Sequence, residues 1–138
     1  MVITKEIRLD TQGHTDIVDI TNYVIRAVGE TGLRAGIVTI FCPGSTGGLT
    51  TIEYESGVVS DLQEILEEII PTDRDYQHHR RWGDYNGSSH LRSALIGPSL
   101  TVPFVDGTLT LGTWQQIVFL DFDMRARSRR LVVQILGE

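Results

Sequence analysis

The C-terminal part of the chain, from residue 99 onward, is a succession of short apolar runs rich in β-branched and aromatic side chains. Runs of this kind, bounded by turn residues, are typical of strands. The expected strands cover residues 99–104, 108–112, 114–123 and 130–136, and Trp114 is expected to lie in the core. Asp106 and Gly107 separate the first two runs, and Asp-Gly between apolar runs is a strong hairpin signal. The pattern predicts an antiparallel meander.

The preceding part of the chain mixes strands with helices. Strands are expected at residues 2–9, 36–42 and 49–55, and helices at 58–70, at 88–95 and from Thr21 to about Gly29 or Gly32. The helix at 58–70 is the clearest, because its apolar residues follow helical spacing and acidic residues occupy the other face. Ser56 is its expected N-cap. The order of elements predicts an α+β fold, mainly an antiparallel β-sandwich with flanking helices.

Composition narrows the class of protein. The chain has 138 residues and is expected to form a single domain over residues 1–138. Its net charge of −6 argues against binding to nucleic acid or to an anionic membrane. No apolar run reaches the length needed to span a bilayer, and the N-terminal residues lack a signal peptide pattern. Cys42 is the only cysteine, which fits a reducing compartment, so a cytoplasmic location is expected.

The segment from Tyr76 to His90, Y-Q-H-H-R-R-W-G-D-Y-N-G-S-S-H, concentrates groups that bind metals, transfer protons or hold anions. His78 and His90, with a carboxylate such as Asp84 or Glu53, are the candidate ligands of a divalent metal, either zinc or magnesium. The spacing matches no self-sufficient metal motif. The alternative interpretation is a surface loop in which the histidines simply form hydrogen bonds.

His90 has a second possible role. If Ser88 caps the helix at 88–95, His90 lies in its first turn, where free backbone amides and the helix dipole favour anions. A phosphate or carboxylate would then be bound by those amides, with His90 and Asn86 as side-chain partners. In the alternative interpretation, Asn86-Gly87-Ser88 is only a turn and cap, and both interpretations can hold together.

Three further regions offer candidate site residues. The glycine-rich turn Pro43–Gly48 suits close approach of the backbone to a ligand. Glu53 and Glu55 are expected to share one face of the strand at 49–55, with Glu53 as candidate base or ligand. Gln115 is positioned to reach a pocket. The four arginines between residues 125 and 130 are interpreted as a solvated turn balanced by Asp121 and Asp123, with a phosphate clamp as the alternative.

Several stretches together resemble one known family. They are I-E-Y-E, Y-x-H, D-x-N-G-x-x-H-L, G-P-S-L-T-V-P-F, G-T-L-x-L-G-T-W-Q-Q-I and the terminal R-R-L-V-V-Q-I-L-G-E, in order from about Ile37 to the C-terminus. On these residues the chain resembles the YjbQ-like family of small bacterial and archaeal proteins. The resemblance implies a β-sandwich with flanking helices that assembles as a homotrimer, and a secondary thiamine-phosphate synthase activity.

The resemblance also implies a set of site residues and one departure from the family pattern. The set is Ser45, Thr46, Glu53, His78, Asp84, Asn86, His90 and Gln115. Many members have a histidine in the turn where this chain has Gly44.

Two hypotheses follow for the function. In the first, an enzyme-like pocket holds a divalent metal or a small phosphorylated molecule through His78 and His90. The catalytic candidates are Glu53, Asp84 and His90, and the ligand-binding candidates are Ser45, Thr46, Asn86 and Gln115. In the second, the protein is a non-catalytic homotrimer that binds a small ligand or metal. The Gly44 departure favours the second hypothesis.

Overall fold

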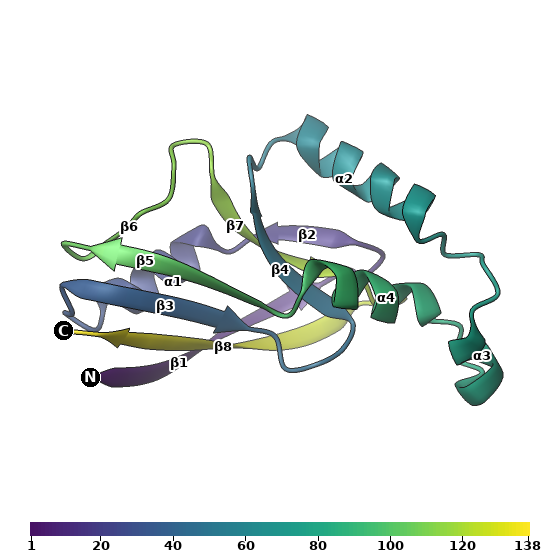
Figure 1. Cartoon of the computed structure of the whole chain (residues 1–138), viewed down its shortest axis with the longest axis horizontal. Coiled ribbons are helices and arrows are strands. Elements are labelled where there is room, and N and C mark those ends of the chain that lie inside the picture. Colours follow the sequence, from purple (N-terminus) through teal and green to yellow (C-terminus); the bar gives the residue numbers. More distant parts are fainter.

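The computed structural model describes all residues from 1 to 138 and has an α+β fold (Figure 1). The strands are β1 (Val2–Thr11), β2 (Asp16–Asp19), β3 (Ala35–Phe41), β4 (Gly47–Ile52), β5 (Ser99–Val105), β6 (Thr108–Leu109), β7 (Gln116–Asp121) and β8 (Arg127–Gly137). The helices are α1 (Thr21–Gly29), α2 (Ser56–Ile69), α3 (Gln77–Trp82) and α4 (Gly87–Ile96). No helix is long and apolar enough to traverse a lipid bilayer.

The strands form two antiparallel sheets that pack in layers. The larger sheet has the order β1-β8-β3-β5-β6, and the smaller one has the order β2-β7-β4. The inner face of the larger sheet packs against α1 and one face of the smaller sheet, and these elements share the main hydrophobic core. Figure 1 shows α2 lying over the other face of the smaller sheet, where a second apolar cluster forms around Leu66.

Strand β7 lies in the middle of these layers and is buried on both faces. Ile117 and Phe119 belong to the core beneath the larger sheet, whereas Val118 and Leu120 belong to the cluster beneath α2. A strand covered on both sides has no need for polar residues at alternate positions, which explains the continuous apolar run in this part of the sequence.

The outer face of the larger sheet is covered by no other element. Val2, Leu136 and Ile37 are neighbours across β1, β8 and β3, and all three are 40% or more exposed. Phe41 and Val105 are exposed on β3 and β5. We call this set of five side chains the outer sheet face. A group of exposed apolar side chains on one sheet face is typical of a protein interaction surface.

The fold class agrees with the sequence, but several local expectations are wrong. Strand β2 was not expected, and the expected strand at 108–112 is limited to Thr108–Leu109. Glu55, not Ser56, caps α2, because its carboxylate accepts hydrogen bonds from the backbone N–H groups of Gly57 and Val58. Glu53 and Glu55 therefore do not share a strand face, since β4 ends at Ile52.

Trp114 was expected in the core, but its side chain is 73% exposed. Strand β7 begins only at Gln116, and the connection from β6 to β7 extends away from the sheets (Figure 1). We call residues 110–115 the Trp114 loop. The core positions in this part of the chain belong to β7 itself, which leaves the tryptophan in solvent.

Candidate functional site

The histidine-rich segment folds as two helices and a tight turn. Helix α3 ends at Gly83, whose φ of 69° is the left-handed conformation that glycine adopts without strain. Residues 84–86 follow, and α4 begins at Gly87. The turn brings the imidazole of His78, on α3, to 4.6 Å from that of His90, on α4, measured between ring centroids. A segment expected to be largely loop is thus mostly helical, and its turn is what places the two histidines together.

Asp84 and Asn86 complete a cluster around His78. Nε2 of His78 lies 3.1 Å from Oδ1 of Asp84 and 2.9 Å from the side-chain amide of Asn86. With its nitrogen facing inward, the Asn86 amide donates to Nε2 of His78, which accepts, and to both carboxylate oxygens of Asp84, at 2.9 and 3.1 Å. These contacts fix the orientation of the His78 ring and engage its Nε2, so a ligand would meet this imidazole through Nδ1.

His79 has a structural role instead. Its ring is buried, and its Nε2 accepts a hydrogen bond of 3.0 Å from the backbone N–H of Gly87. A Cβ atom at Gly87 would lie 2.7 Å from Cβ of Tyr76 and 3.0 Å from Nε2 of His79. Because only glycine fits there, Gly87 and His79 together fix the start of α4, and His79 is unavailable to replace a missing site histidine.

The cluster lies between two hollows. One, of about 320 Å³, is lined by Tyr76, Gln77, His78, Gly87, His90 and Leu91; we call it the histidine hollow. The other, of about 330 Å³, is lined by Asp84, Asn86, Asp123, Met124, Arg125 and Arg127. Leu91 was not recognised from the sequence, although it follows His90 and lies four residues after Gly87, which places it on the same helix face.

Three backbone amides at the start of α4 already have partners. The N–H groups of Ser89 and His90 both donate to the carbonyl of Asn86, and that of Gly87 donates to His79. Ser88 is buried inside the helix and is not its N-cap; Asn86 holds that position without a capping side-chain bond. These three amides are therefore not free to bind an anion, and anion binding here would depend mainly on side chains.

A metal would find an incomplete set of ligands in one chain. No group of three or more His, Cys, Asp or Glu side chains is arranged to hold a metal ion. His78 and His90 offer two imidazoles, but the nearest carboxylate, Asp84, is engaged with His78 and Asn86. Catalytic zinc sites generally use three protein ligands. A single chain therefore supplies one ligand fewer than such a zinc site requires.

Thr46, another candidate ligand-binding residue, is part of a buried ion-pair network. Arg129 donates to Thr46 Oγ1 at 2.8 Å and to both carboxylate oxygens of Asp121, at 2.7 and 2.8 Å. Burial alone would raise the pKa of Asp121, but hydrogen bonds from Arg129, Thr11 and a backbone amide together hold that pKa below its ordinary value. Thr46 is thus committed to structure, whereas Ser45 beside it is exposed.

The arginine-rich hairpin agrees only in part with its interpretation as a solvated turn. Asp121 and Asp123 do balance arginines, as expected, but the Arg129–Asp121 pair is buried. Arg127 pairs with Asp123, and Arg130 pairs with Glu6 at 3.0 Å. Arg125 is exposed and has no carboxylate within ion-pairing distance.

The last two candidates, Glu53 and Gln115, lie at the opposite end of the molecule. Gln115 donates to Thr51 Oγ1 at 3.0 Å, which holds it against the end of β4. Glu53 follows β4 and is exposed without a side-chain partner. In Figure 1 this end carries the Trp114 loop between β6 and β7, far from α3 and the start of α4. The predicted site is therefore divided within one chain.

Comparison with known proteins places these features in a family. Residues 5–138 match the family model described as UPF0047 protein YjbQ-like. A UPF0047 protein of Methanothermobacter thermautotrophicus is 39% identical over 99% of this chain and 94% of its own length. YugU of Bacillus subtilis, also named a UPF0047 protein, is 31% identical over 96% of this chain and 98% of its own.

Solved structures agree with this assignment. A Sulfolobus solfataricus protein described as YbjQ-like and of unknown function superposes with a TM-score of 0.94 at 31% identity, covering 100% of this chain and 99% of that one. A YjbQ/UPF0047 family protein of Clostridium acetobutylicum gives a TM-score of 0.88 at 34% identity, covering 96% and 99%. The match over nearly the whole length, in sequence and in fold, shows that this chain belongs to the YjbQ-like UPF0047 family.

Proposed function

We propose that the histidine hollow binds a small phosphorylated molecule or a divalent metal ion, zinc or magnesium, and that His78 and His90 hold it. One observation carries this proposal. His78, Asp84, Asn86 and His90, selected from the sequence for their chemistry, form one cluster beside an open hollow. Clusters of titratable side chains lining a concave surface are the default candidates for binding and catalysis.

Each member of the cluster has a distinct role in this proposal. Asn86 donates to His78 and is itself held by Asp84, so the two residues together orient the imidazole, as outer partners orient a ligating or catalytic histidine. His90 has no hydrogen-bond partner for its ring, so it is free to bind an anion or transfer a proton. Two imidazoles close together stabilise a phosphate when they are protonated, because positive charge and N–H donors then face the anion.

The reaction that we propose for this pocket is the secondary thiamine-phosphate synthase activity implied by the family resemblance. In that reaction the carbon–oxygen bond between the pyrimidine methylene group and pyrophosphate breaks, and the electron pair leaves with pyrophosphate. The thiazole nitrogen forms the new bond to the methylene carbon. Stabilising the charge on the departing pyrophosphate is the main catalytic task, and His78 and His90 are the groups placed for it.

A non-catalytic homotrimer that binds a small ligand or metal is the alternative function. Gly44 favours it, because this chain lacks the histidine that many family members have in that turn. The exposed outer sheet face supports self-association, because Val2, Ile37 and Leu136 would be removed from water by a second copy. We also propose a cytoplasmic location, which the single buried free cysteine supports.

Calorimetric titration with zinc, magnesium and inorganic pyrophosphate tests the proposal. The wild-type protein is expected to bind at least one of them, and His78→Asn and His90→Asn are each expected to weaken that binding at least tenfold. His14→Asn is the matched control, because His14 is exposed, lies outside the cluster and has a left-handed backbone that asparagine tolerates. Equal affinities in all four proteins would refute the assignment.

Turnover then separates the two functions. A thiamine-phosphate synthase must form product from the two heterocyclic phosphates and release pyrophosphate. The melting temperature of a binding protein would rise in the presence of the ligand, because binding to the folded state alone stabilises that state. The ligand itself would remain chemically unchanged.

A further inference from the structure

The Trp114 loop of one copy and the histidine hollow of another have complementary properties. We propose that the Trp114 loop closes over the histidine hollow of a neighbouring copy of this chain, so that the candidate site is shared between subunits. The inference rests on the proposed function for what the site does. Its separate claim is that the Trp114 loop, Glu53 and Gln115 come to the site from a neighbouring subunit.

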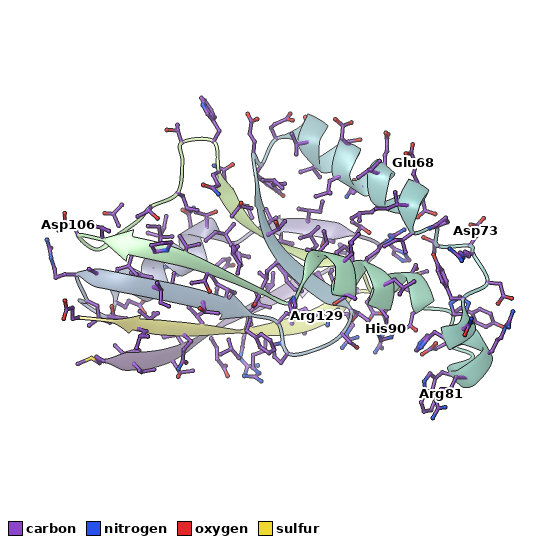
Figure 2. All side chains as sticks on the ribbon, in the orientation of Figure 1. Glu68, Asp73, Arg81, His90, Asp106 and Arg129 are labelled. Carbon is purple, nitrogen blue, oxygen red and sulfur yellow. The ribbon has the colours of Figure 1, made fainter.

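The Trp114 loop lies far from the histidine hollow of its own chain. The Trp114 loop lies near the tip of β4, and Glu53 directly follows that strand, whereas His90 and Arg81 lie at the end formed by α3 and α4 (Figures 1 and 2). Hydrogen bonds from Gln115 to Thr51 and from the Tyr54 N–H to Gln116 fix the first end to the smaller sheet. The loop cannot reach its own histidines without unfolding this corner.

The Trp114 side chain is exposed to solvent in the single chain. A tryptophan that is 73% exposed leaves a large apolar surface in water, and tryptophan is the residue type most enriched at the energetic centres of protein interfaces. The histidine hollow offers an apolar counterpart. Leu91 is 47% exposed at its rim, and Tyr76 and Gly87 form part of its wall. Burying the indole there would remove both surfaces from solvent.

The two regions also carry unpaired side chains of opposite charge. Glu53, beside the Trp114 loop, is exposed and has no cationic partner. Arg81, on α3 beside the hollow, has no carboxylate partner and stacks on Trp82 at 5.2 Å. Asp61, in the first half of α2 after Glu53, is exposed as well. An unpaired carboxylate of one copy and an unpaired guanidinium of another attract each other in a head-to-tail contact.

The histidine hollow of one chain has an incomplete set of ligands. His78 and His90 leave a metal or a phosphate with two side-chain donors, and Asp84 is already engaged. Two predicted site residues, Glu53 and Gln115, lie far from the histidines of their own chain. A neighbouring copy would bring both close to His78 and His90. A head-to-tail contact of this kind closes into a ring when its rotation allows, which is compatible with the proposed trimer.

Chemical cross-linking tests the contact directly. Trp114→Cys and Leu91→Cys chains, carrying tags of different size, are co-expressed and treated with a short bis-maleimide. We expect a cross-linked product containing both tags. Trp114→Cys with Tyr23→Cys is the control, because Tyr23 is similarly exposed but lies on α1, away from the hollow. Absence of the mixed product, or equal yield with the control pair, would overturn the proposal.

Oligomeric state provides the second measurement. Trp114→Ala removes an exposed side chain, so the monomer is expected to fold normally while its self-association weakens at least tenfold in sedimentation velocity; Tyr23→Ala is expected to leave association unchanged. A Trp114→Ala protein that associates and binds its ligand like wild type would refute the shared site. The reverse result, a cross-link without zinc, magnesium or pyrophosphate binding, would refute the proposed function and leave the shared contact standing.

Discussion

Nε2 of His78 lies 3.1 Å from Oδ1 of Asp84, across the turn that joins α3 to α4. The two residues come from a helix and from the loop that follows it, so their approach depends on the left-handed turn at Gly83. Asn86 contacts both and links them into one unit. The unit has no evident role in the hydrophobic core, because Asp84 is 46% exposed and His78 is 28% exposed.

Asp84→Asn is expected to weaken ligand binding without unfolding the protein. The substitution keeps the shape of the side chain but removes the charge that orients His78, and loss of such a partner generally costs about 10- to 100-fold in affinity. Calorimetric titration measures the effect. Asp75→Asn is the control, because Asp75 is exposed and pairs only with Arg80 on the outside of α3. A similar loss in both variants would count against the orienting role.

Asp121→Asn is expected to destabilise the fold by about 3–5 kcal/mol, the usual cost of leaving one partner of a buried ion pair uncompensated. Arg129 is 7% exposed and would lose its counter-ion in the interior. Urea denaturation measures the free energy of unfolding. Glu6→Gln disrupts the exposed Glu6–Arg130 pair and is expected to cost no more than about 1 kcal/mol. An equal loss of unfolding free energy in the two variants would show that the buried pair contributes no more to stability than the exposed one.

Gly87→Ala is expected to destabilise the fold by about 1–3 kcal/mol through overpacking. The new methyl group would lie 2.7 Å from Cβ of Tyr76, and it would push α4 away from His79. Gly29→Ala is the control, since nothing lies within 4 Å of its Cβ position at the end of α1. Thermal denaturation compares the two. A melting temperature lowered equally in both would contradict the close packing at Gly87.

Glu67 is expected to make the stability of the fold decrease at acidic pH. Hydrogen bonds from the hydroxyl and backbone N–H of Thr72, together with one from Arg92, lower the pKa of Glu67 from 4.5 to about 2. A lowered pKa in the folded state means that the ionised carboxylate stabilises the fold above pH 4.5, and that this contribution is lost as the pH falls toward 2. The effect is small because Glu67 is half exposed.

Melting curves of wild type and Glu67→Gln between pH 6 and pH 2 measure this dependence. The difference in melting temperature is expected to be largest near pH 6 and to shrink as the carboxylate is protonated. A difference that stays constant over the whole range would mean that the ionisation of Glu67 is not linked to folding.

The sequence predicted the fold class well because hydrophobic patterning is local. The apolar run of β7 and the amphipathic pattern of α2 both identify their elements from neighbouring residues alone. Trp114 shows where this reasoning fails. A large aromatic residue beside an apolar run is usually buried, but the strand begins only at Gln116 and the loop extends into solvent.

The candidate site was predictable only where its residues are close in sequence. His78, Asp84, Asn86 and His90 lie within one helix–turn–helix segment, so local composition was enough to group them. Glu53 was grouped with them as a candidate carboxylate ligand, and both Glu53 and Gln115 by family resemblance, but the local sequence does not indicate how far the fold separates these two residues from the histidines. Thr46 was assigned to ligand binding, but a long-range partner, Arg129, takes its hydroxyl oxygen.

The measurement that tests the central claim most directly is the nitrogen-15 NMR spectrum of the histidine rings during titration with zinc, magnesium and inorganic pyrophosphate. The chain has only four histidines, so each ring can be assigned by substitution. The account predicts that the signals of His78 and His90 shift together with at least one of these ligands while those of His14 do not. Signals of His78 and His90 that stay unchanged with all three ligands, or that shift no more than those of His14, would contradict it.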